Sequence, residues 1–250
     1  MPMNDFVNLW VYLSSTPLFG LTATLVVYLV AHAAYLRCQQ APWANPVLWS
    51  IVIIAAGLLL AGVPYQTYFS GAQFIHFLLG PAVVALAWPL WFRRHELQRR
   101  WRRLLRAALI GGATASLSAV VLGWVLGLPA DIVLSLAPKS VTAPVAMGIA
   151  EAIGGIPALS AVFAVLTGLV GALTGRYLFD AMRIPKHPSG WAARGYALGT
   201  ASHGIGAARA LQVDPDAGAY AGLALGLQVI LAALLIPLAF RAMTWIAALF

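Results

Sequence analysis

A lysine, a serine and a threonine stand close together within residues 136–144, whose sequence is LAPKSVTAP. Lys139 carries a full positive charge, and Ser140 and Thr142 offer hydroxyl groups for hydrogen bonding. Ser140 is also expected to cap a half-helix that runs onward from here, and such an N-terminus carries a partial positive charge. Together these groups suit the binding of a small carboxylate.

Two prolines interrupt the chain around these side chains. Pro138 and Pro144 remove backbone donors and break a helix, although the flanking sequence is apolar enough for a membrane. Because an ionisable group at the centre of a bilayer costs about 2.5–3.5 kcal/mol or more, the segment is expected to lie where protein or water surrounds it. A structural alternative is that Lys139 pairs with Asp131 or Glu151.

A second polar group lies within residues 198–209, whose sequence is LGTASHGIGAAR. Thr200 and Ser202 can cap a broken helix, and Arg209 can hold a carboxylate through two hydrogen bonds. His203 can change its protonation state near neutral pH, which suits proton coupling. The glycines that would permit the break are Gly199, Gly204 and Gly206.

The two ionisable residues of this group also have structural alternatives. A buried histidine such as His203 is often a satisfied hydrogen-bonding residue and not a proton carrier. Arg209 could mark the cytoplasmic mouth of a pathway, or it could pair with Asp214 or Asp216. The sequence alone leaves these alternatives open.

Glu151 is the third candidate, because it precedes a glycine pair, Gly154 and Gly155, that must turn the chain. As an intramembrane carboxylate it could bind a coupling cation or pair with Lys139. Equally, it could be an interfacial residue near the outer surface. Glu151 is therefore a coupling candidate beside His203.

Composition identifies a polytopic membrane protein. The chain has 250 residues, of which 62% are hydrophobic and 9% are charged, with a mean hydropathy of +0.87. Soluble domains carry roughly 25% charged residues. The N-terminus lacks the basic region of a signal peptide. A single cysteine, Cys38, excludes an intrachain disulfide and a thiolate metal site.

An all-α fold in a single integral membrane domain, residues 1–250, is predicted. Two interrupted stretches, 130–154 and 190–211, are expected to be re-entrant hairpins, the first from outside and the second from the cytoplasm, although 190–211 could cross fully. Residues 1–92 would form a scaffold and 104–250 the transport region. Gln228 is expected to form a helix–helix hydrogen bond. The six predicted spans are 17–35, 46–63, 74–92, 104–126, 157–178 and 217–240.

The basic residues fix an expected orientation. Seven of the fifteen lysines and arginines lie between Arg93 and Arg106. This loop is expected to be cytoplasmic and to contact anionic lipids, which leaves the N-terminus outside. Hairpins entering from opposite faces are compatible with an inverted repeat, and a weak echo links residues 79–89 to residues 136–144. In a membrane protein this charge does not indicate nucleic-acid binding.

Several signature blocks resemble those of the LrgB/CidB family of holin/antiholin-like membrane proteins. Ala143 and the pair Met147 and Gly148 depart from the pattern, and the tryptophan- and arginine-rich residues 93–106 look idiosyncratic. The resemblance covers roughly residues 15–243. Its blocks are 78–89, 138–144, 151–157 and 199–209.

The resemblance implies two kinds of function. Bacterial members are described as regulators of murein hydrolase export and autolysis, with a small membrane partner of the LrgA/CidA type. A related plastid protein translocates glycolate and glycerate, and bacterial relatives are linked to pyruvate or similar carboxylates. A transporter in the bacterial inner membrane, with a homodimer as the first expectation for its assembly, is therefore predicted.

Transport agrees better with the residues than pore formation, because a holin needs neither a midplane lysine nor two broken helices. The expected substrates are small 2-hydroxy- or 2-oxo-monocarboxylates of the glycolate, glycerate, lactate or pyruvate type. The sequence contains no Walker A motif, paired catalytic carboxylates or zinc-protease motif. Neither an enzyme nor a cofactor nor a metal is expected.

Overall fold

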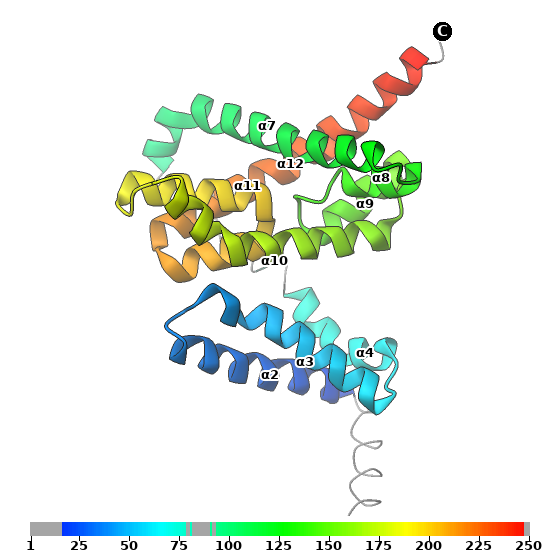
Figure 1. The fold of residues 1–250 in the computed structure, drawn as a ribbon, viewed down its shortest axis with the longest axis vertical. Coiled ribbons are helices and arrows are strands. Elements are labelled where there is room, and N and C mark those ends of the chain that lie inside the picture. The colour runs from blue at the N-terminus through cyan, green and yellow to red at the C-terminus, as the bar shows by residue number, and fades with distance from the viewer. Residues whose placement is uncertain (1–16, 79–80, 82–90, 92–93, 248–250) are drawn as a thin grey trace, which may run out of the picture. The chain divides into compact units, whose positions relative to one another are not determined.

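The computed structural model describes residues 17–78, 81, 91 and 94–247. All regular structure in this part of the chain is helical, which confirms the predicted all-α class (Figure 1). The chain divides near residue 84 into two compact units. Each unit is described on its own below.

The described part of the first unit contains three α-helices, whose ends follow from local chemistry. The carboxamide oxygen of Asn45 accepts from the backbone N–H of Val47 at 2.9 Å and of Leu48, which caps the N-terminus of α3. Gly62 ends α3 in the left-handed conformation (φ 63°). The third predicted span, 74–92, lies mostly outside the described residues. The helices are α2 (Pro17–Arg37), α3 (Pro46–Ala61) and α4 (Tyr65–Phe77).

The second unit contains the predicted transport region. Among the described residues of this unit, the helices α7, α10 and α12 are each long and apolar enough to cross a membrane, as is α2 of the first unit. The side-chain amide of Gln228 donates to the Ala108 carbonyl at 2.6 Å, so the expected helix–helix bond is present. The helices are α7 (Arg94–Val125), α8 (Ala130–Leu136), α9 (Ala143–Ile153), α10 (Pro157–Ala181), α11 (Pro188–Val213) and α12 (Pro215–Ala247).

The expectation of a loop at residues 93–106 was wrong. Residues from Arg94 onward are already helical and continue without interruption into the span. Arginine, glutamine, glutamate and leucine are good helix formers, so the basic run extends α7 beyond its apolar part instead of ending it. The positive charge is thus carried on a rigid element.

The predicted hairpin at 130–154 is formed by α8 and α9. After a left-handed turn at Gly127 (φ 69°), α8 packs back along the end of α7, where Val133 and Leu136 lie against Gly123. The two helices have 7 and 11 residues, or about 10 and 16 Å at 1.5 Å per residue. Neither could cross an apolar layer of about 30 Å. Gly154 ends α9 with φ 86°.

The second predicted hairpin, 190–211, is formed within α11. Its backbone leaves helical geometry at Ser202 (φ −127°, ψ 16°) and His203 (φ 40°, ψ −134°). Beyond this break the chain folds back, since a Cβ at Gly206 would lie 2.7 Å from the carbonyl oxygen of Leu198. In a continuous helix these residues would be about 12 Å apart. We refer to residues 188–201 and 204–213 as the first and second arms.

Both ends of α11 lie at the same end of the bundle. Gly195 packs against Ala217 and Gly199 packs against Ala221, so the first arm runs in the same direction as α12. The second arm must therefore return before α12 begins, as its path in Figure 1 shows. Of the two alternatives for 190–211, the structure has the hairpin and not a full crossing.

The second unit therefore contains an inverted repeat. A long helix followed by a helical hairpin occurs twice, first as α7 with α8 and α9, then as α10 with the two arms of α11. The long helices α7 and α10 run in opposite directions, and α12 follows the second copy (Figure 1). Most of residues 79–89, which the sequence echo linked to 136–144, lies outside the described residues, and the observed repeat involves other segments.

Cysteine labelling can check this topology. On a Cys38→Ser background, Gln98→Cys, Lys186→Cys and Val213→Cys should react with an impermeant maleimide from one side of the membrane only. Leu128→Cys and Ile156→Cys, which flank the first hairpin, should react from the opposite side only. If positions 186 and 213 reacted from opposite sides, α11 would cross the membrane and the hairpin would be contradicted.

Candidate functional site

The tip of the first hairpin places three predicted site residues between α8 and α9. The helical start differs from the expectation, because the N-cap residue of α9 is Thr142 and not Ser140. A turn in which the Val141 N–H donates to the Pro138 carbonyl delays the helix by two residues. The Ser140 hydroxyl is consequently left inside the protein, 8% exposed and without a hydrogen-bond partner.

Lys139 lies partly buried at this tip. The proposed structural pairs do not form, because Asp131 lies at the start of α8 and Glu151 lies near the end of α9. Both carboxylates are exposed, at the opposite end of the hairpin from the tip. Neither carboxylate therefore pairs with the ammonium group of Lys139.

The tip of the second hairpin is built around the break in α11. The Nε2 of His203 donates to the Ala164 carbonyl of α10 at 2.7 Å, and the side chain is 4% exposed. This bond leaves Nδ1 as the nitrogen that can accept a proton. Ser202, 1% exposed, packs against Gly171, and the His203 ring packs against Gly168. Only glycine leaves room for the tip against α10.

Thr200 and Arg209 flank this break on the two arms. The Thr200 hydroxyl is buried without a hydrogen-bond partner, and its methyl group faces Gly111 of α7. Arg209 is 6% exposed and lies on the second arm, about two turns beyond the tip. A buried guanidinium at this depth requires compensation by protein or ligand groups.

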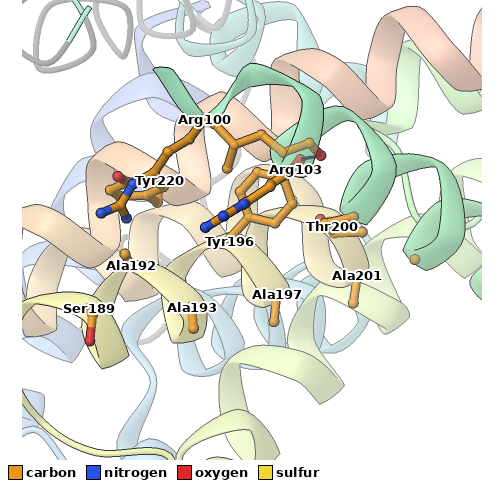
Figure 2. A pocket seen from close by; sticks show the side chains of 13 residues that line it. Arg100, Arg103, Ser189, Ala192, Ala193, Tyr196, Ala197, Thr200, Ala201 and Tyr220 are labelled. Atoms are coloured by element: carbon orange, nitrogen blue, oxygen red, sulfur yellow. Dashed lines mark hydrogen bonds between the residues drawn. The ribbon is translucent and has the colours of Figure 1, made fainter. Parts of the chain in front are cut away.

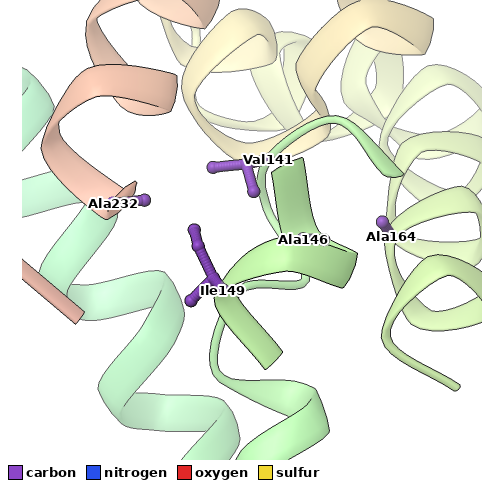
Figure 3. Packing of buried hydrophobic residues seen from close by; sticks show 5 residues of the cluster. All are labelled: Val141, Ala146, Ile149, Ala164 and Ala232. Carbon is purple, nitrogen blue, oxygen red and sulfur yellow. The ribbon is translucent and has the colours of Figure 1, made fainter. Parts of the chain in front are cut away.

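Both tips lie at the middle of the same two long helices. On α7, Gly111 meets Thr200 and the Ser116 hydroxyl donates to the Ala137 carbonyl. On α10, Ala164 accepts from His203 and also packs in one apolar cluster with Val141 (Figure 3). The N-termini of α9 and of the second arm therefore approach the same level from opposite ends. The remaining cluster residues in Figure 3 are Ala146, Ile149 and Ala232.

The predicted hinge residues are divided between the tips and other positions. Pro138 is fully buried at the first tip, whereas Pro144 is exposed in the first turn of α9. Gly154 and Gly155 lie at the base of the first hairpin with Glu151, away from the tips. The break occurs at Ser202 and His203, not at the glycines expected there. Those glycines mainly allow close packing, Gly199 on Ala221 and Gly206 on Leu198, while Gly204 adjoins open space.

Sequence reasoning missed a clamp at the base of the second hairpin. Arg194, 4% exposed, donates to the Asp180 carboxylate at 2.7 Å and to the Ile184 carbonyl. Its guanidinium lies over the rings of Phe179 and Trp191. The polar groups singled out in the sequence do not include Arg194. Its aromatic neighbour three residues earlier was the one available signal.

A groove of about 600 Å³ lies between α7 and the first arm of α11. Thr200 lies at one end of it, and Arg100 and Arg103 lie at the other, with Tyr196 between them (Figure 2). The groove was not predicted, because no single segment contains its lining. Across the described residues, no group of three or more histidine, cysteine or carboxylate side chains could hold a metal ion.

Comparison with known proteins adds a family relationship. Residues 24–242 match the model of the LrgB-like family. Uncharacterized protein YxaC of Bacillus subtilis is 33% identical over 220 residues, which covers 86% of this chain and 94% of the relative. An uncharacterized protein of Haemophilus influenzae is 34% identical over 197 residues, covering 79% and 84%. No solved structure matches the chain.

The fit of the second tip against α10 can be tested by adding one methyl group. Gly171→Ala should lower stability by about 1–3 kcal/mol, because the new Cβ collides with the Ser202 side chain. Gly226→Ala on α12 is the matched control, since nothing lies within 4 Å of its Cβ position. Thermal unfolding in detergent would show the difference. Equal melting temperatures for the two variants would contradict the close packing of this tip against α10.

Proposed function

The chain belongs to the LrgB-like family of membrane proteins, and from that premise we propose that it is a secondary transporter of small 2-hydroxy- or 2-oxo-monocarboxylates. One observation supports this most strongly. Two interrupted elements point their tips at the same level of the bundle from opposite ends, and a buried hydroxyl without a hydrogen-bond partner lies at the first tip (Ser140) and beside the second (Thr200).

The charges around the tips favour an anion. Two helix N-termini converge there, each with free N–H groups and a partial positive charge. Lys139 adds a full charge at the first tip, and the two carboxylates of this hairpin, Asp131 and Glu151, lie at its opposite end. An intramembrane site of positive charge is costly when empty, which favours a role in binding a negatively charged ligand.

The hydroxyl groups give the site its second recognition element. We assign the substrate carboxylate to Lys139 and the N-terminus of α9. Ser140 and Thr200 would then bond the neighbouring hydroxyl or oxo oxygen, since unpaired buried hydroxyls gain most from a polar ligand. Thr142, Ser202 and Arg209 remain supporting candidates. A ligand with polar groups on adjacent carbons would use both the positive charge and the hydroxyl groups.

His203 can couple a proton to the substrate. Its ring is buried beside positively polarised helix ends, so a second positive charge there is unfavourable without a partner. A bound carboxylate supplies that partner, and binding of proton and substrate then becomes mutually favourable. Cotransport of one proton also removes the cost of moving an anion against the membrane potential, about 2.3 kcal/mol per 100 mV.

The family resemblance also implies an alternative function of another class. In this alternative the protein is a holin/antiholin-like regulator of autolysis without a transported substrate. Four further predictions concern its surroundings. They are a small LrgA/CidA-type partner, a homodimer, contact of residues 93–106 with anionic lipids, and a location in the bacterial inner membrane. Uptake of radiolabelled glycolate or pyruvate by liposomes that contain the purified protein separates the classes. Uptake no faster than in empty liposomes, for every small monocarboxylate tried, would contradict transport.

Lys139→Ala should abolish saturable uptake, because the substrate anion loses its counter-charge. Insertion and monodispersity should be unchanged. Lys186→Ala is the matched control, since this lysine lies 52% exposed in an ion pair with Asp180 outside the tips. Initial uptake rates for the two variants would be compared at equal protein density. Wild-type uptake by Lys139→Ala would remove this residue from the site.

An imposed inward proton gradient should accelerate uptake by the wild-type protein. His203→Gln should keep a hydrogen bond to the Ala164 carbonyl but lose this acceleration, while substrate exchange continues. Uptake and exchange measured with and without the gradient would separate coupling from binding. If the variant responded to the gradient as the wild type does, His203 would be structural, and Glu151 would be tested next.

A further inference from the structure

The groove between α7 and the first arm of α11 has a polar group at each end and mainly small side chains between. The two elements run in the same direction, because the Tyr196 hydroxyl donates to the Leu104 carbonyl and, further along, Thr200 meets Gly111. The groove therefore follows both helices from the basic end of the unit to Thr200 and Ala201, beside the second tip. Its small lining residues include Ala107, Ala193 and Ala197.

The charged side chains that line the groove are positive and lie at one end of it. Arg100 and Arg103 line its wide end, and none of its lining residues is a carboxylate. Figure 2 shows the Arg103 guanidinium beside Tyr196. Tyr196 lies one helical turn before Thr200 on the first arm. A concave surface lined by charge of one sign concentrates ions of the opposite sign.

The inverted repeat allows this groove to be compared with its counterpart. The equivalent contact on the other side of the repeat is between the start of α10 and α8. There the Ile156 N–H donates to the Ser135 hydroxyl at 2.7 Å, and a Cβ at Gly155 would lie 2.9 Å from the Ser135 nitrogen. This counterpart is closed by direct backbone contact. Of these two equivalent contacts, the one at the basic end is therefore open as a groove and the other is closed.

We propose that this groove is the water-filled path by which a small carboxylate passes between the basic end of the protein and the hairpin tips, with Arg103 attracting the anion at its mouth. The proposal rests on the proposed transport function for the identity of its ligand. The groove itself, its charge and its closed counterpart are properties of the structure alone. An anionic lipid lying in the groove is the competing occupant.

Thiol chemistry can test the path without measuring transport. On a Cys38→Ser background in nanodiscs, Ala193→Cys and Ala197→Cys should react with methanethiosulfonate reagents, because a thiol must contact water to ionise. Val170→Cys, at an exposed apolar position of α10, is the control and should react at least tenfold more slowly. If Ala197→Cys reacted as slowly as this control, the groove would be filled by lipid or protein and the proposal would be overturned.

A second experiment tests whether Arg103 attracts anions at the mouth of the groove. The ratio of reaction rates for the anionic and the cationic reagent at Ala197→Cys should fall at least about fivefold when Arg103→Gln is added. Arg106→Gln is the matched control, because Arg106 lies in the same basic run but does not line the groove. Equal effects of the two substitutions would remove Arg103 as the attracting residue.

The same variants distinguish a failed path from a failed function. Glycolate should slow modification of Ala197→Cys, and Arg103→Gln should raise the KM for uptake more than it lowers the maximal rate. If the thiols react with anion preference but no monocarboxylate is taken up or protects them, the path stands and the proposed substrate class fails. If uptake occurs and the thiols do not react, transport stands and the path fails.

Discussion

Backbone N–H and C=O groups inside a membrane must find partners within the protein, and the two interrupted elements of this chain depend on that requirement. Side chains of the long helices meet it at the first tip, where the Ser116 hydroxyl of α7 bonds the Ala137 carbonyl. At the second tip the relation is reversed, and the His203 side chain bonds a carbonyl of α10. Each break is therefore hydrogen-bonded to the long helix that precedes it.

The second break is held in a costly conformation. His203 has a positive φ of 40° with ψ −134°, a combination that is sparsely populated by residues other than glycine and costs of the order of 1–3 kcal/mol. The bond to Ala164 and close packing on Gly168 and Gly171 compensate for it. The side chain assigned to the proton is thus also a main support of the hairpin's shape.

The sequence predicted both hairpins because their signals are local. Prolines, glycines and polar residues in 130–154 and 190–211 interrupt otherwise apolar sequence, although the sequence left open whether 190–211 turns back or crosses fully. The sequence did not predict features that depend on distant segments. The Arg194 clamp needs Asp180 from another helix, and the groove needs α7 beside α11. The N-cap position at Thr142 was not predicted, because the turn that delays the start of α9 cannot be inferred from the positions of the prolines.

The apolar cluster at the first tip has a consequence for how the protein is made. Val141 and Ile149 pack against Ala164 of α10 and Ala232 of α12, both of which leave the ribosome after the hairpin does. The hairpin cannot partition into lipid by itself, because its open carbonyls and Lys139 have no partners there. It must therefore wait in a polar environment at the insertion machinery until α12 has been synthesised, so the middle of this chain is expected to enter the membrane after its C-terminal helix.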